Sequence, residues 1–142
     1  MRRTAGGALI HEGKILLGLR SSEANYYPGV WDIFGGHLEE GESPGAALIR
    51  ELTEELGITE PEFEQICIYN EPRIQEYGHA EHHIYAVTGW HGQPTKLGNE
   101  HSEIGWFTPE AMSHLHLAST LYLKLFTKYV ERAAITQAQK LL

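Results

Sequence analysis

Short runs rich in apolar residues recur along the chain and predict β-strands. The first two, residues 5–10 and 14–19, flank Glu12-Gly13, a dipeptide that favours a tight turn and therefore a hairpin. Later runs have the β-branched and aromatic content that is typical of strands. They cover residues 31–33, 63–70, 82–90 and 104–107. Residues 72–78, between two of these runs, are predicted to form a strand or a connection.

Two longer segments have the periodicity of helices. In the first, Ser43 and Pro44 are typical of an N-cap and a first helical position, and Gly57 is typical of a helix end. Its apolar stripe is predicted to consist of Ala46, Ile49, Leu52 and Leu56.

The second helix is predicted over residues 119–132, and the tail 133–142 either extends it or frays. Thr108-Pro109 marks a further helix start. Strands that alternate with two helices favour an α/β fold in which a mixed sheet lies between helical layers.

The first helix also carries a group of acidic residues, Glu51, Glu54 and Glu55. Positions three and four apart lie on the same face of a helix, so these carboxylates are expected to project together. Like charges in such positions repel one another. A divalent cation would remove the conflict, because Mg²⁺ prefers oxygen ligands and commonly binds substrate phosphates as well.

An acidic run on a helix is also compatible with a simple solvated face. That interpretation does not account for Gly35-Gly36, which provide the backbone freedom needed where a chain approaches a ligand closely. We interpret Arg50 and Glu42 as an ion pair that ties the preceding loop to the helix.

Residues 36–58 resemble the Nudix box, G-x5-E-x7-R-E-U-x-E-E-x-G-U with U an aliphatic residue, at every specified position. The resemblance extends to the approach Trp31-Asp32-Ile33-Phe34-Gly35-Gly36 and to the later segment 101–112, and covers residues 4 to about 130. It implies the α/β/α Nudix sandwich. Phe34 departs from the family pattern, which commonly has proline there, and this departure affects the floor of the substrate pocket.

The resemblance also implies a set of site residues. Glu51, Glu54, Glu55 and the backbone carbonyl of the Gly36 loop would hold Mg²⁺, with Mn²⁺ as a substitute. In relatives the general base is either the glutamate equivalent to Glu51 or a loop carboxylate before the penultimate strand. For the loop position we prefer Glu100, a further metal ligand, over Glu103. Arg20, His37 and Phe34 are the expected substrate-binding residues.

Composition narrows the range of partners. The chain has 142 residues, which predicts one domain, residues 1–142, and its net charge of −8 argues against a nucleic acid polymer as partner.

The single cysteine, Cys67, lies in an apolar run and is expected to be a buried, inert thiol. Without a signal peptide or a membrane-spanning run, the protein is expected to be cytoplasmic. The oligomeric state stays open.

Other residue types leave alternatives. Nine histidines raise a zinc hypothesis for His79, His82 and His83, but their spacing matches no zinc motif, so surface or strand positions are preferred. Several aromatic residues could stack on a base, although large rings usually belong to the core. These residues are Tyr26, Tyr27, Trp31, Phe34 and Tyr85.

The resemblance predicts a Mg²⁺-dependent hydrolase that cleaves a diphosphate linkage in a small nucleotide. The preferred substrate is a nucleoside triphosphate, oxidised or not, which is converted to a monophosphate and pyrophosphate. The alternatives are ADP-ribose or another nucleotide sugar or dinucleotide and, in a different class, a non-catalytic nucleotide sensor.

Overall fold

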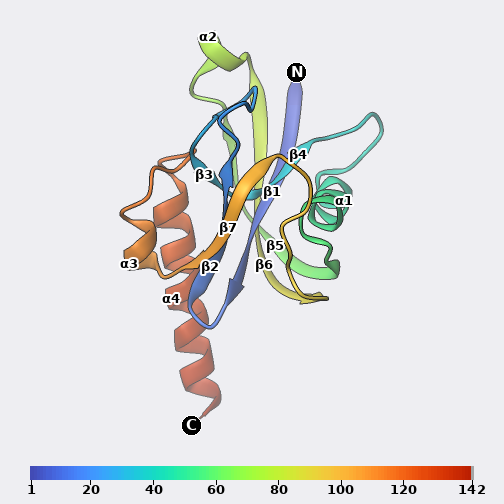
Figure 1. Cartoon of the computed structure of the whole chain (residues 1–142). Helices are drawn as coiled ribbons and strands as arrows, with labels where there is room; N and C mark the ends of the chain where they lie inside the picture. The colour runs from blue at the N-terminus through green and yellow to red at the C-terminus, as the bar shows by residue number, and fades with distance from the viewer. Residues whose placement is uncertain (142) are drawn as a thin grey trace.

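A computed structural model describes residues 1–141 and shows a twisted sheet with helices on both sides (Figure 1). In chain order the elements are β1 (Arg2–His11), β2 (Lys14–Arg20), β3 (Trp31–Asp32), β4 (Phe34–His37), α1 (Pro44–Leu56), β5 (Thr59–Asn70), α2 (Ile74–Tyr77), β6 (Ala80–His91), β7 (His101–Phe107), α3 (Pro109–Met112) and α4 (Tyr122–Lys140).

Strand β1 lies at the centre of the sheet and changes partner along its length. On one side it pairs with β6 in parallel, and β5 follows as an antiparallel edge strand. On the other side, residues 4–7 pair with β4 and residues 9–11 pair with β2, both antiparallel. Strand β2 in turn pairs with β3 and β7. The sheet is therefore mixed and divides beside β1 into a branch with β4 and a branch with β2.

The predicted α/β/α layers are confirmed. Helix α1 covers one face of the sheet, and α3 and α4 cover the other (Figure 1). On the α1 face, Leu48, Leu52 and Leu56 are fully buried against strand residues such as Leu9 and Val87. Burial of each leucine contributes about 1.5–3 kcal/mol. On the opposite face, Tyr122 and Phe126 of α4 pack over an apolar cluster from β1, β2 and β6.

The ends of α1 follow the predicted chemistry. The Ser43 side chain accepts a hydrogen bond from the Ala46 amide at 3.2 Å, and Pro44 opens the first turn. Gly57 ends the helix with a φ of 70°, a left-handed conformation that glycine adopts without strain.

The predicted apolar stripe of α1 is wrong in part. Ala46 and Ile49 are exposed, and the buried positions are Ala47, Leu48, Leu52 and Leu56 together with Glu51 and Glu55. Two of the three glutamates therefore share the buried side of the helix with the leucines. The stripe is displaced because Glu51 packs against Gly36 of β4 and Glu55 is also buried, so the cation-binding face of the helix overlaps its apolar face.

Other element boundaries differ modestly from the predictions. Residues 72–78 contain a short helix, α2, and β7 begins at His101. Helix α4 begins at Tyr122 and continues through the tail to Lys140, beyond the sheet (Figure 1). Cys67 is only half-buried. In the part of the chain described, none of the helices is both long and apolar enough to cross a membrane.

Candidate active site

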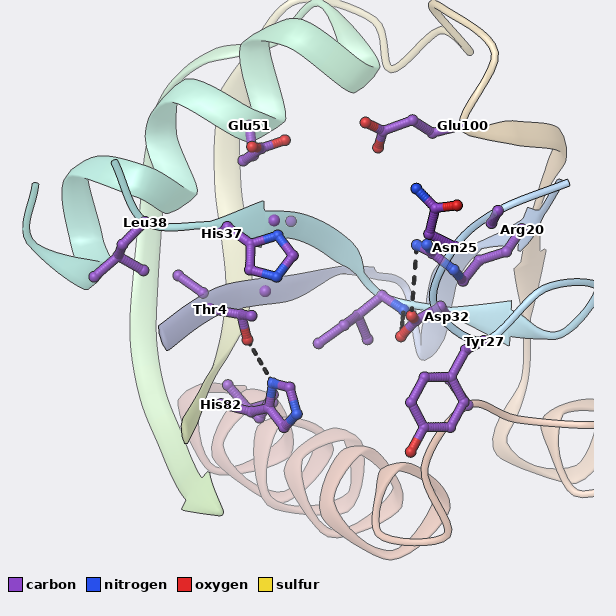
Figure 2. Close-up of a pocket in the computed structure, with 18 of the residues that line it drawn as sticks. Thr4, Arg20, Asn25, Tyr27, Asp32, His37, Leu38, Glu51, His82 and Glu100 are labelled. Atoms are coloured by element: carbon purple, nitrogen blue, oxygen red, sulfur yellow. Dashed lines mark hydrogen bonds and ion pairs between the residues drawn. The ribbon is translucent and has the colours of Figure 1, made fainter. Parts of the chain in front are cut away.

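A cavity of about 790 Å³ opens where the sheet divides (Figure 2). This volume is within the usual range for small-molecule sites. Both branches of the sheet, helix α1 and the loops before β3 and β7 contribute to its wall. The lining includes Thr4, Arg20, Asn25, Tyr27, Asp32, Gly36, His37, Arg50, Glu51, Tyr69, Glu71, His82, Glu100 and Tyr122.

Gly36 allows helix α1 to approach the sheet closely. A Cβ atom at this position would lie 2.5 Å from Oε1 of Glu51, closer than atoms of real side chains come. Glycine therefore makes room for the Glu51 carboxylate against the backbone of β4. This contact places the Glu51 carboxylate directly beside Gly36.

Arg50 holds the loop and the first glutamate in place. Its guanidinium donates to both oxygens of Glu42 at 2.8 and 2.9 Å, which confirms the predicted pair. It also donates to Oε1 of Glu51 at 2.8 Å and to the carbonyl of His37 at 3.1 Å. Hydrogen bonds from Arg50 hold the pKa of Glu42 at about 2. Arg50 thus fixes the orientation of Glu51.

A second acidic group lies farther along α1. Carboxylate oxygens of Glu55 and Glu100 and a ring nitrogen of His101 all lie within 4.8 Å of one another. Within residues 1–141, neither oxygen of Glu55 has a hydrogen-bond partner, and the Nε2 atom of His101 has none either. Burial, followed by the nearby Glu100 and Glu51 carboxylates, raises the pKa of Glu55 well above its ordinary value.

These contacts fit a divalent cation. Buried carboxylate oxygens without partners are energetically costly, and a hard cation would satisfy them and cancel the repulsion between Glu51, Glu55 and Glu100. Figure 2 shows Glu100 pointing from the loop before β7 toward the α1 helix, where Glu51 lies across the gap. Glu54 is different: its side chain is 58% exposed and contacts Arg50 at 3.4 Å. Glu54 therefore lies at the rim of the cluster.

Basic and polar groups occupy the middle of the cavity. Arg20, at the end of β2, donates to the Tyr26 carbonyl at 2.8 Å and lies 3.9 Å from Asp32. His37, at the end of β4, also lines the cavity. Burial and nearby cations, Arg2 first among them, lower the pKa of His37. The structure thus brings Arg20 and His37 to the same cavity as the carboxylates.

A hydrogen-bonded network closes the end of the cavity farthest from α1. The Tyr27 hydroxyl donates to Glu71 at 2.5 Å, and the other Glu71 oxygen lies 3.0 Å from Nε2 of His82. Nδ1 of His82 lies 2.6 Å from the Thr4 hydroxyl (Figure 2). The Arg73 amide also donates to Glu71. The network joins the loop before β3 to β1, β6 and the segment after β5.

Phe34 does not lie on the cavity wall. Its side chain is fully buried in the core beside α1, and its ring lies 5.1 Å from that of His101, centre to centre. Tyr85 is likewise a core residue. The structure therefore does not bring the Phe34 ring to substrate, whereas Tyr27 does line the cavity.

Sequence reasoning missed His101 because of an irregularity in the sheet. The pairing of β2 with β7 shifts between Leu19 and Arg20, so that Leu19 is opposite Glu103 and Arg20 is opposite His101. Simple alternation along β7 therefore fails to predict that His101 faces inward. The one available signal was its position directly after Glu100. His82 and Glu71 are 11 positions apart, on opposite sides of α2, and no sequence pattern connects them.

The fold and the carboxylate cluster together define a class of enzyme, the Nudix pyrophosphohydrolases. The chain belongs to the Nudix family: the model of the NUDIX domain matches residues 1–128.

Curated relatives and solved structures agree with this assignment. The chain is 35% identical over 107 residues to the CTP pyrophosphohydrolase of Escherichia coli K12, a match that covers 75% of this chain and 76% of that protein. It is 30% identical over 125 residues to the nucleoside triphosphatase NudI of E. coli K12, covering 81% and 89%. The crystal structure of a MutT NUDIX hydrolase from Burkholderia pseudomallei superposes with a TM-score of 0.72 at 28% identity, covering 78% and 84%.

Proposed function

We propose that this protein hydrolyses a nucleoside triphosphate to a nucleoside monophosphate and pyrophosphate, with Mg²⁺ as cofactor and Mn²⁺ as a substitute. Two carboxylates that line a nucleotide-sized cavity, Glu51 and Glu100, together with the buried Glu55 beside them, carry this proposal. The names of two relatives, a CTP pyrophosphohydrolase and a nucleoside triphosphatase, support a triphosphate as the substrate class.

In this proposal Glu51, Glu54, Glu55, Glu100 and the Gly36 carbonyl hold the metal. A bound divalent cation neutralises phosphate oxygens and lowers the pKa of water. The protein's own groups position the reactants: Arg50 fixes Glu51, and Arg20 and His37 bind phosphate oxygens in the middle of the cavity. Phosphoryl transfer to water depends mainly on such positioning and charge stabilisation.

The overall reaction consumes one water molecule. An oxygen of water forms a bond to phosphorus, the bridging P–O bond breaks, and a carboxylate accepts the proton that water loses. We assign this base to Glu100 rather than Glu51: Oε1 of Glu51 accepts a hydrogen bond from Arg50, whereas Glu100 would hold the metal through one oxygen and keep the other for the proton. Glu100 is exposed to the cavity opening.

A substrate panel with product identification tests the proposal. Nucleoside triphosphates, oxidised purine triphosphates and ADP-ribose should be incubated with Mg²⁺, with Mn²⁺ and with excess chelator. We expect monophosphate and pyrophosphate from at least one triphosphate, and no turnover in chelator. Reaction in ¹⁸O-labelled water would show which phosphorus is attacked.

Other outcomes would contradict parts of this assignment. Preferential cleavage of ADP-ribose would replace the triphosphate as substrate but keep the reaction class. Full activity in chelator would refute the metal-dependent mechanism. Tight nucleotide binding without turnover of any panel member would favour a nucleotide sensor.

A further inference from the structure

His101 lies beside the acidic cluster without the partner that a buried imidazole requires. Its exposed fraction is 3%, and that of Glu55 is 5%. Among the described residues, Nε2 of His101 and both oxygens of Glu55 form no hydrogen bond. Since buried polar atoms normally have partners, three such atoms beside one another indicate a ligand that they share.

The spacing of these donors suits a cation. One donor atom each of Glu55, Glu100 and His101 lies within 4.8 Å of the other two, so the three atoms surround a common point. Two ligands of one transition-metal ion, each about 2.1 Å from it, are separated by up to about 4.2 Å. Small side-chain adjustments would therefore bring all three donors onto one ion.

The fold fixes the orientation of the imidazole. A Cβ atom at Gly18 would lie 2.5 Å from Cδ2 of His101, so glycine leaves just enough room for the ring. The Phe34 ring packs beside it with 5.1 Å between ring centres. Phe34, which the sequence suggested as a substrate contact, instead supports His101. The orientation of the His101 imidazole toward Glu55 and Glu100 is thus fixed by the packing of β2, β4 and β7.

We propose that His101 is a nitrogen ligand of the divalent cation held by Glu55 and Glu100, and that this site binds Mn²⁺ or Co²⁺ more tightly than Mg²⁺. Mg²⁺ prefers an all-oxygen environment. Imidazole suits transition-metal ions, whose affinity for mixed nitrogen and oxygen donors rises from Mn²⁺ to Co²⁺. This inference rests on the metal-dependent function proposed above and specifies its ion.

Pulsed electron paramagnetic resonance of the Mn²⁺-loaded protein tests the ligand directly, without substrate. The common oxygen isotope has no nuclear spin, so a ligand set of carboxylates and water gives no directly bound nitrogen coupling. We expect a ¹⁴N coupling of a bound imidazole in the wild type and its loss in His101→Gln. His114→Gln, which replaces an exposed histidine, is the matched control and should keep the coupling.

Calorimetric titration with Mg²⁺, Mn²⁺ and Co²⁺ gives the second measurement. His101→Gln should lower the affinity for Co²⁺ at least about tenfold and change that for Mg²⁺ less than about twofold. His114→Gln should leave both affinities unchanged. Thermal melting in chelator establishes that each variant is folded before titration.

These results separate the inference from the proposed function. Absence of a nitrogen coupling in the wild type, or its persistence in His101→Gln, would overturn the inference even if triphosphates are hydrolysed. An equal loss of Mg²⁺ and Co²⁺ affinity in His101→Gln would also overturn it. Conversely, a nitrogen coupling in a protein that cleaves no nucleotide would support the ligand assignment and refute the proposed reaction.

Discussion

Glu55 is buried among apolar side chains of α1, yet none of the described residues donates a hydrogen bond to it. Burial raises its pKa well above the ordinary glutamate value of 4.5, which means that folding disfavours its charged form. In the metal-free protein Glu55 therefore destabilises the folded state increasingly as the pH rises above the pKa that Glu55 has in the unfolded chain. This loss of stability stops growing once the pH exceeds the pKa of Glu55 in the folded protein.

Glu55→Gln should consequently stabilise the metal-free protein while abolishing most of the activity. The gain should be near zero at pH 4.5 and grow with pH by at most about 1.4 kcal/mol for each unit. Melting curves of the wild type and the variant in chelator, recorded from pH 4.5 to 8, measure this gain in stability. The contributions of the other acidic residues are common to both proteins and cancel in the difference. A variant that melts below wild type across this range would contradict the assigned environment.

Arg50 has the opposite role, because it stabilises charges that would otherwise be unpaired. Arg50→Ala removes the partner of Glu42 and Glu51 and the donor to the His37 carbonyl. We expect the melting temperature in chelator to fall by several degrees and kcat to fall as well, since Glu51 loses its fixed orientation. Glu54→Gln, at the exposed rim, should melt close to wild type. If Glu54→Gln melted well below wild type and Arg50→Ala did not, the structural role would belong to Glu54 and not to Arg50.

At the scale of elements, the loop before β3 depends on Tyr27. Its backbone φ is 50°, which is uncommon for a residue with a side chain, and its hydroxyl donates to the buried carboxylate of Glu71. The same loop presents the Tyr26 carbonyl to Arg20. Anchoring of the loop and orientation of Arg20 are therefore linked through two adjacent residues.

Tyr27→Phe should weaken substrate binding more than turnover. Loss of a hydrogen bond to a carboxylate costs about 1–3 kcal/mol, and a freer loop should raise KM several-fold with a smaller change in kcat. Steady-state kinetics of Tyr27→Phe in the wild-type and Arg20→Ala backgrounds separate the two contributions. If the effect acts through Arg20, it should largely disappear in the Arg20→Ala background. An undiminished effect there would show that Tyr27 acts independently.

Local patterns predicted the elements of this fold well where the relevant contacts are local. Ser43, Pro44 and Gly57 bound α1 as expected, because capping involves residues close in sequence. The rotation of α1 was predicted less well, since burial of Glu51 and Glu55 depends on the loop carrying Glu100 and on the glycines of β4. The partner change of β1 and the irregular pairing that turns His101 inward arise between distant strands, and neither leaves a local pattern.

The residues of the candidate site also differ in how far local sequence predicts their contacts. The Arg50–Glu42 pair followed from one contiguous segment and is confirmed. The positions of Arg20, His37 and Glu100 around one cavity agree with the family resemblance, whereas their roles remain predictions. The network of Thr4, Tyr27, Glu71 and His82 assembles four separate segments, so only the folded chain reveals it.

At the scale of the whole molecule, α4 extends past the body of the domain (Figure 1). Residues 131–141 are exposed along their whole length, and Arg132 forms the last described ion pair, with Glu64 at 3.5 Å. Because this segment buries no apolar side chain, a chain ending after Arg132 should lose less than about 0.5 kcal/mol of stability.

Activity should also be unchanged in that truncated chain, since none of residues 123–141 lines the cavity. Chemical denaturation and kinetics of the two lengths at one protein concentration measure both effects. A large loss of stability would show that the projecting helix has an unrecognised partner. Comparison of their sedimentation would then identify a second copy of the chain as that partner.

The parallel pair at the centre of the sheet has a consequence for the order of folding. Arg2 pairs with Ala80 and Leu9 pairs with Val87, so the paired residues are 78 positions apart, more than half of the length of the chain. During synthesis β1, the glycine loop and α1 leave the ribosome well before β6 exists. One edge of β1 stays open through that interval, and closure of the long intervening loop is a natural slow step. Helix α1 therefore cannot pack against the complete sheet until β6 has been synthesised. Pairing of β6 with β1 is thus the step that commits the chain to its fold.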